Sequence, residues 1–114
     1  MSEKKHLYVL WTSGDPITAD KMVFMYTINA MANGWWDEVT LVIWGGSTKL
    51  VSEDETIQQR VRDAQDAGVY VTACKGCSDQ LGVSERLEAL GVDVQYYGVA
   101  LTNILKEDEV LLTI

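Results

Sequence analysis

Two cysteines separated by two residues are the side chains best suited to chemistry in this chain. Cys74 and Cys77 are its only cysteines, and they directly follow the apolar segment 69–73. A thiol attacks as the thiolate, which the amides of a helix start and a nearby cation both favour. We expect residues 78–81 to form a helical turn whose amides point back at Cys74, and Lys75 to add positive charge. The pattern predicts sulfur chemistry at Cys74, with Cys77 as the assisting or resolving thiol.

Three other roles for the cysteine pair are less favoured by the sequence than sulfur chemistry: simple packing, a thioredoxin-type site and a zinc site. The two cysteines could pack as small buried hydrophobes, although Lys75 and Gly76 between them favour a loop. A thioredoxin-type oxidoreductase needs a cis-proline in a loop after the motif, whereas the sole proline, Pro16, lies far upstream. A structural zinc site needs four Cys or His ligands, but the chain has one histidine besides the cysteines, and it begins the first expected strand. We therefore expect neither a metal within one chain nor a cofactor; a metal site shared between subunits stays open.

Length and composition are typical of one acidic globular domain. The 114 residues form a single expected domain, 1–114, and 47% of them are hydrophobic, which argues against disorder. The net charge of -8 argues against a nucleic acid or an anionic membrane as partner. No apolar run approaches the roughly 20 residues of a membrane span, and no signal-peptide core follows the first residues. We expect a cytoplasmic location, where a close cysteine pair is more often reactive than a static staple.

Strand-like and helical segments alternate along the chain. The expected strands are segments 6–11, 39–44, 69–73, 92–96 and 110–113. Their nearly continuous apolar and β-branched runs are typical of parallel strands that helices cover on both faces. The alternation predicts an α/β fold, with the cysteine pair at the carboxyl end of the third strand. Reactive groups gather at such ends in sheets of this class.

Capping and helix-breaking residues predict where the helices begin and end. Asp15 and Pro16 suit a helix start. Ser52 to Glu55 fits a capping box for a helix that ends near Gly68. Ser84 could cap a short helix, and a last helix should cover 99–105. The segment 45–48 is expected to be a plain turn, with anion binding by its amides as the alternative.

The first helix carries apolar residues on two sides. One stripe contains Ala19, Val23, Tyr26 and Ala30, and the other contains Ile17, Phe24, Ile28 and Met31. A helix that is apolar on two sides is usually buried on two sides. Either deep burial in the monomer or a subunit interface would explain this, and the second predicts a homo-oligomer.

Several short motifs resemble the DsrE/DsrF-like family, in particular its members with a second cysteine. The residues that carry the resemblance are Leu41-Val42-x-Trp44-Gly45, Gly68-Val69-x-Val71-x-x-Cys74, Ala73 to Val83, Gly91 to Val94, and Tyr97-Gly98. The resemblance implies a three-layer α/β/α sandwich with a five-stranded, mainly parallel sheet. It also implies a homo-oligomer, a trimer or hexamer, and a sulfur relay that passes persulfide sulfur. Its relay cysteine maps onto Cys74, whereas Cys77 is absent from many relay members.

The leading hypothesis is a small cytoplasmic sulfur carrier that exchanges sulfur with a donor or acceptor protein. Cys74 would be the nucleophile or persulfide carrier, and we expect it to be alkylated faster than Cys77. Two alternatives stay open: an oligomeric small-ligand-binding module in which the cysteines are incidental, and a Cys74–Cys77 thiol–disulfide switch. Whether the protein is an enzyme is left open by the sequence.

Overall fold

One five-stranded sheet organises the chain. The computed structural model describes residues 5–114. Within them, the strand order is β4-β3-β2-β1-β5 and all four pairings are parallel. The strands are β1 (His6–Trp11), β2 (Glu38–Ile43), β3 (Tyr70–Cys74), β4 (Asp93–Gln95) and β5 (Val110–Thr113). The predicted α/β architecture is confirmed, and the sheet is parallel throughout these strands.

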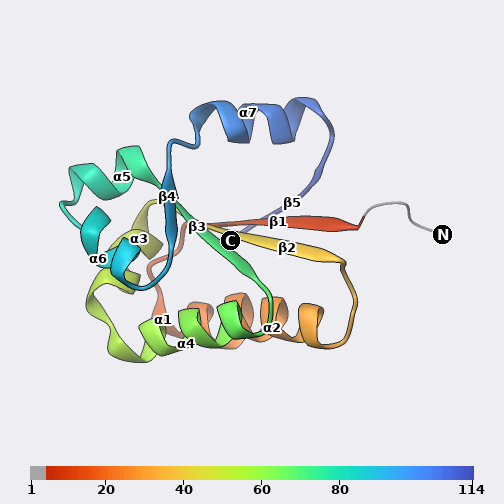
Figure 1. Cartoon of the computed structure of the whole chain (residues 1–114), viewed down its shortest axis with the longest axis horizontal. Helices are drawn as coiled ribbons and strands as arrows, with labels where there is room; N and C mark the ends of the chain where they lie inside the picture. The colour runs from red at the N-terminus through yellow and green to blue at the C-terminus, as the bar shows by residue number, and fades with distance from the viewer. Residues whose placement is uncertain (1–4) are drawn as a thin grey trace.

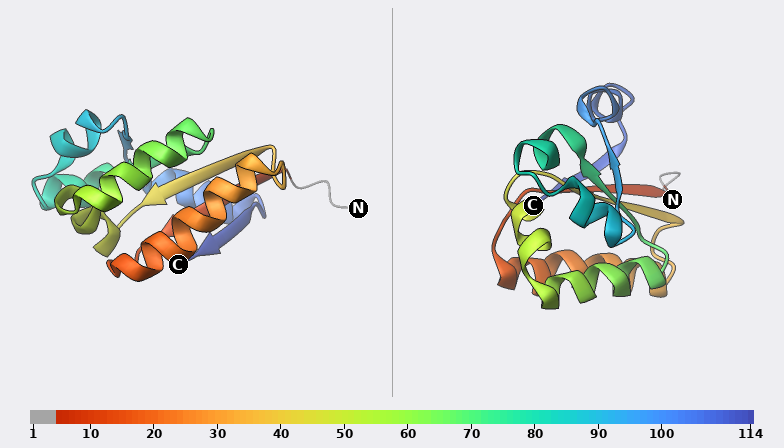
Figure 2. Two further views of the ribbon diagram at one scale, coloured as in Figure 1. Left: turned by 90° about the horizontal axis from the view of Figure 1, so that it is seen from below. Right: turned by 60° about the vertical axis from the view of Figure 1, so that its left-hand side comes forward.

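Helices cover the two faces of the sheet unequally (Figures 1 and 2). One face carries α2 (Met25–Ala32) and α4 (Glu55–Asp66), whereas α7 (Gly98–Lys106) lies on the opposite face. The short helices α3 (Gly46–Glu53), α5 (Lys75–Gln80) and α6 (Ser84–Ala89) gather toward the carboxyl ends of the strands. Three layers result, and the layer formed by α7 is the thinner one.

The unequal cover creates two apolar clusters. The main core lies on the α2 and α4 side and contains inward residues of three strands, such as Val9, Leu41 and Val71. A second, smaller cluster joins Val42, Cys74 and Tyr97 on the other face. Side chains alternate between the faces of a strand, which explains why Cys74 belongs to the second cluster although its neighbour Ala73 belongs to the first.

The first helix contains a π-helical segment that its sequence pattern does not reveal. Asp15 caps α1 (Pro16–Thr18), as predicted, and the π-helix η1 (Ala19–Phe24) leads into α2. A π turn inserts an extra residue and shifts the helix face, so the consecutive residues Val23 and Phe24 are both fully buried. The expected second stripe is therefore wrong in part: Phe24 lies in the core, whereas Ile17 is 71% exposed.

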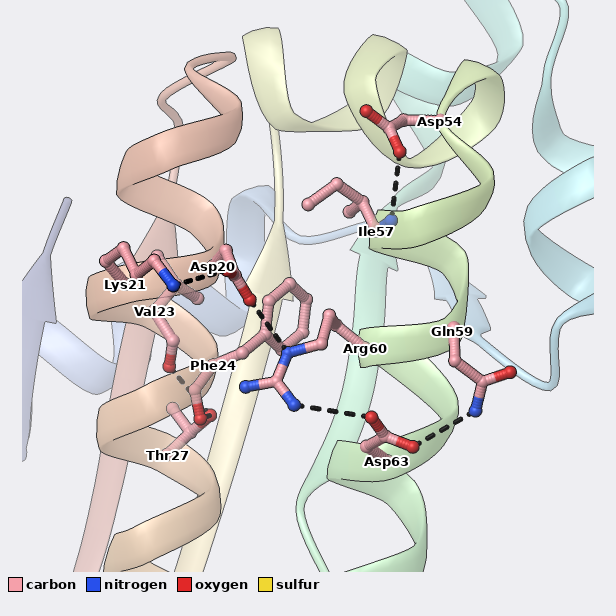
Figure 3. A network of polar contacts seen from close by, with 10 residues as sticks. All are labelled: Asp20, Lys21, Val23, Phe24, Thr27, Asp54, Ile57, Gln59, Arg60 and Asp63. Atoms are coloured by element: carbon pink, nitrogen blue, oxygen red, sulfur yellow. Dashed lines mark hydrogen bonds and ion pairs between the residues drawn. The ribbon is translucent and has the colours of Figure 1, made fainter.

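An ionic cluster joins η1 to α4 (Figure 3). Arg60 Nε lies 3.0 Å from Asp20 Oδ1, and its Nη1 lies 3.3 Å from Asp63 Oδ2. The first contact is an ion pair without the alignment of a hydrogen bond, because Nε has no hydrogen-bond partner among the described residues. Thr27 in α2 donates to Val23 O at 2.8 Å, which gives a carbonyl near the π turn a partner. The cluster holds the irregular helix against its neighbour.

Most predicted elements are confirmed, and three local predictions are wrong. The bounds of β1, β5 and α7 agree with the sequence pattern to within one residue. The expected turn at 45–48 is instead the start of α3. Asp54, not Ser52, caps α4 by accepting from Ile57 N at 3.1 Å. Val83 occupies the N-cap position of α6, and Ser84 is its first helical residue.

Candidate functional site

Cys74 lies where a central strand becomes a helix. It is the last residue of β3 and the N-cap residue of α5, with extended backbone angles of φ -72° and ψ 113°. The predicted helical turn is therefore present, and it begins at Lys75, earlier than expected. Cys74 is 6% exposed and packs with Val42 and Tyr97. Its thiol is sheltered by the second cluster.

Cys77 is the more accessible of the two thiols. It is the third residue of α5, is half-buried, and packs against the same cluster as Cys74. Its thiol donates to the hydroxyl of Thr48 at 3.5 Å. Both cysteines are free thiols. The structure thus brings the two predicted site residues together, but the exposure of their side chains favours faster alkylation of Cys77, the reverse of the expected order.

Lys75 is directed toward a carboxylate. Its ammonium lies 3.3 Å from Asp79 Oδ2 and 5.8 Å from the centre of the Tyr96 ring. The hydrogen bond to Asp79 is the main cause that raises the pKa of Lys75. Hydrogen bonding by Ser84, and then by Lys75, lowers the pKa of Asp79. The contacts of this lysine therefore give no support to the expected role of stabilising the Cys74 thiolate.

A polar network fixes α5 against α6. Ser78 is fully buried, and its hydroxyl lies 2.6 Å from that of Ser84. Ser84 in turn donates to Asp79 Oδ1 at 2.5 Å, and Asp79 pairs with Lys75. Because this chain of contacts includes residues on both sides of Cys77, it fixes the helix turn that presents the second thiol.

A shallow hollow of about 320 Å³ opens beside Cys77. Its lining contains the residues that cap and begin α3, one lysine, and residues of α5 and its end: Gly45, Gly46, Lys49, Cys77, Gln80 and Leu81. Sequence reasoning did not find this hollow, because it forms only where α3 and α5 lie side by side. The glycine pair at 45–46 was the only signal for it.

A larger hollow, of about 410 Å³, has neither thiol in its lining, although it includes Tyr97, which belongs to the same buried cluster as Cys74. Much of its lining lies near the amino ends of the strands or on α7, among them His6, Tyr8, Thr40 and Ile104. His6 Nε2 lies 2.7 Å from Thr40 Oγ1 and its Nδ1 lies 3.0 Å from Glu38 Oε2. Burial is the main cause that raises the pKa of Tyr8, followed by the nearby carboxylate of Glu109. Size alone therefore does not identify the reactive site.

The described residues offer no ready-made metal centre or membrane helix. Across residues 5–114, no three His, Cys, Asp or Glu side chains come together as a metal would require. No helix in this range is long and apolar enough to cross a bilayer.

The fold and site define a class of α/β protein with a parallel five-stranded sheet and a sheltered cysteine at the end of a central strand. Among solved structures, the chain is similar to the conserved protein of unknown function BT1422 from Bacteroides thetaiotaomicron. The two share 34% identity at a TM-score of 0.95, over 96% of this chain and 95% of that one. The chain belongs to the same family as BT1422.

Two more distant structures share the fold. The ychN protein from E. coli has a TM-score of 0.71 at 18% identity, over 97% of this chain and 99% of that one. The protein of unknown function MTH1491 from Methanobacterium thermoautotrophicum has a TM-score of 0.74 at 18% identity, over 98% and 100%. No protein-family model and no curated protein matches the chain.

Proposed function

We propose that this protein is a DsrE/DsrF-like sulfur carrier in which Cys74 holds sulfur as a persulfide. The observation that supports this most is the location of Cys74, buried at the end of β3 beside a second free thiol. Other thiols easily reduce a persulfide, so a carrier needs to shelter it between donor and acceptor. Cover by Tyr97, which is itself 9% exposed, would provide that shelter.

Each transfer is an exchange between thiolate and sulfane sulfur. The Cys74 thiolate attacks the outer sulfur of a donor persulfide, the donor S–S bond breaks, and the donor leaves as a thiolate. An acceptor thiolate then attacks the outer sulfur on Cys74 in the same way, and Cys74 leaves as a thiolate. Neither step needs an external oxidant or reductant.

Cys77 gives the carrier a second route for release. Its thiolate could attack the inner sulfur on Cys74, which would expel hydrosulfide and leave a Cys74–Cys77 disulfide. Two electrons from a thiol reductant would then restore both thiols. The closeness of two free thiols also favours a thiol–disulfide switch as the second candidate function.

Sulfur loading distinguishes these functions. The purified protein is incubated with a cysteine desulfurase and cysteine, and its intact mass is measured. A carrier gains the mass of one sulfur; Cys74→Ala abolishes the gain, and Cys77→Ala retains it. A wild-type protein that gains no sulfur, but forms a disulfide at a cytosolic redox poise, would favour the switch. Absence of both reactions would favour a binding module.

We further propose that the protein works in the cytoplasm as a homo-oligomer. Two side chains of α7, Val99 and Leu105, are 76% and 61% exposed, and Tyr96 just before the helix is also exposed. These exposed apolar side chains on and just before one helix are the surface on which the proposal rests. Sedimentation should detect an assembly that Val99→Glu weakens. A wild-type monomer at all concentrations would contradict this proposal.

A further inference from the structure

Lys49 and Cys77 both line the hollow at the carboxyl end of the sheet. They differ from Lys75, which is ion-paired, and from Cys74, which is buried. Lys49 forms no ion pair with any described residue, whereas Lys75 is engaged by Asp79. The hollow therefore combines the more accessible thiol with an unpaired ammonium group.

The remaining lining suits a small sulfur compound. Leu81 and the two glycines present mostly apolar surface, which suits a soft, poorly hydrated sulfane sulfur. Gly45 makes no side-chain cap at the start of α3, so the first amides of this eight-residue helix have no side-chain acceptor there. These amides add to the positive potential that Lys49 provides. A volume of about 320 Å³ lies at the lower end of the range for small-molecule sites.

Among the described residues, Lys49 is the one charged residue in the lining of the hollow beside Cys77. An adjoining hollow also contains Lys49 and Leu81 in its lining, and it adds Arg86 and Glu53. Arg86 also lines a neighbouring hollow with Asp79 and Glu85, so carboxylates offset its charge. The charge of Lys49 in the lining of the hollow beside Cys77 therefore favours an anion, on a chain whose overall charge of -8 otherwise repels one.

We propose that Cys77 is the receiving thiol for a low-molecular-weight anionic sulfane donor, whose negative group is held by Lys49. This rests on the proposed sulfur-carrier function and names the class of donor. The shared chemistry is a sulfane sulfur next to an anionic group, as in thiosulfate or in the persulfide of a carboxylate-bearing thiol. Sulfur received at Cys77 then passes to Cys74 for sheltered storage.

The atoms and charges balance in both steps. With thiosulfate, the Cys77 thiol releases its proton to solvent and the thiolate attacks the outer sulfur. The S–S bond breaks, and sulfite leaves with the electron pair as a dianion. Cys77 then carries a persulfide anion. The Cys74 thiolate attacks its outer sulfur, a new S–S bond forms on Cys74, and Cys77 leaves as a thiolate.

Single-turnover loading of the full chain tests this proposal. The probes are thiosulfate, glutathione persulfide and the uncharged hydroxyethyl persulfide, read out by sulfite release for the first and by intact mass for all three. Lys49→Gln should slow loading from at least one anionic probe about five- to tenfold, and added salt should reduce the difference. Its rate with the uncharged probe should stay unchanged. Lys106→Gln removes the same charge from the end of α7 and should match wild type.

The cysteine variants identify the receiving thiol. Cys77→Ser should abolish loading from the small anionic probes but retain loading from a cysteine desulfurase. Equal rates for Lys49→Gln and wild type, or unimpaired loading of Cys77→Ser by these probes, would overturn the proposal. Wild type that loads from the desulfurase but from neither anionic probe would overturn it as well, and would leave the carrier function standing. No loading from any donor would refute the carrier function itself.

Discussion

The cover over Cys74 should control how fast this thiol reacts. Tyr97 belongs to the same small buried cluster as Cys74 and is 9% exposed. Replacing a buried aromatic residue by alanine costs about 3–5 kcal/mol and leaves a cavity. We therefore expect Tyr97→Ala to destabilise the protein by about 3 kcal/mol, which a domain of ordinary stability of roughly 5–15 kcal/mol survives. The missing ring opens a path to the sulfur.

The kinetic effect follows from the opening reaction. A buried thiol reacts mainly from locally open states, and each 1.4 kcal/mol of opening free energy suppresses the rate about tenfold. If about half of the stabilisation lost in Tyr97→Ala lowers the free energy of this local opening, alkylation of Cys74 should accelerate about tenfold. Tyr97→Phe keeps the ring, so we expect its rate to stay within about twofold of wild type. Iodoacetamide labelling followed by peptide mass spectrometry measures each cysteine separately.

A matched variant separates local from global opening. Ile57 is buried in α4 on the other face of the sheet, and Ile57→Ala should cost about 2–5 kcal/mol. It should leave the Cys74 rate nearly unchanged under native conditions. Equal acceleration by Ile57→Ala and Tyr97→Ala would show that the whole protein opens. An unchanged Cys74 rate in Tyr97→Ala would refute the idea that this ring shelters the thiol.

Three further predictions concern stability. Burial, and then the hydrogen bond to Asp93, raise the pKa of Tyr70 from its ordinary 10.0 to about 12. The neutral phenol stabilises the fold below pH 10, and this stabilisation is lost as the pH rises toward about 12. In urea unfolding, Tyr70→Phe should therefore lose less stability than wild type between these pH values. An identical loss in both proteins would contradict this. A Cβ on Gly46 would lie 3.0 Å from two backbone atoms, so we expect Gly46→Ala to cost about 1–3 kcal/mol of stability. Gly76→Ala is the control, because its Cβ meets nothing within 4 Å. Equal urea midpoints for the two variants would exclude the steric reason. Arg60→Met removes the ion pairs with Asp20 and Asp63 shown in Figure 3 and should lower stability by up to about 1 kcal/mol. A loss that salt does not reduce would point to lost packing instead.

The sheet could be predicted from the sequence because its strands are compact apolar runs. The pattern of β1 and β5 gave their bounds correctly, and Cys74 fell at the expected strand end. Helix α3 could not be predicted in the same way, since its first residues are a glycine pair that is typical of a turn. Gly45 is needed for its positive φ of 72°, and Gly46 for its close approach to Gly14. The second is a contact between the start of α3 and the loop after β1, which no local pattern records.

Side-chain direction was the other part that the sequence could not predict. Lys75 stands next to Cys74 in the chain, yet a carboxylate one helical turn later engages its ammonium. Lys49 is 25 positions before Cys74 in the chain, yet it lines the same hollow as Cys77 because α3 and α5 meet. The π-helix η1 could not be predicted either, because a single extra residue in the turn shifts the buried face without changing the composition.

The location of the carried sulfur tests the central proposal most directly. Trypsin cleaves after Arg62, Lys75 and Arg86, so Cys74 and Cys77 fall on separate peptides, 63–75 and 76–86. After desulfurase loading, free thiols and persulfides are alkylated before digestion, and the peptides are weighed. We predict that the extra sulfur lies on peptide 63–75. Sulfur found only on peptide 76–86, or on neither, would contradict the assignment of Cys74 as the carrier.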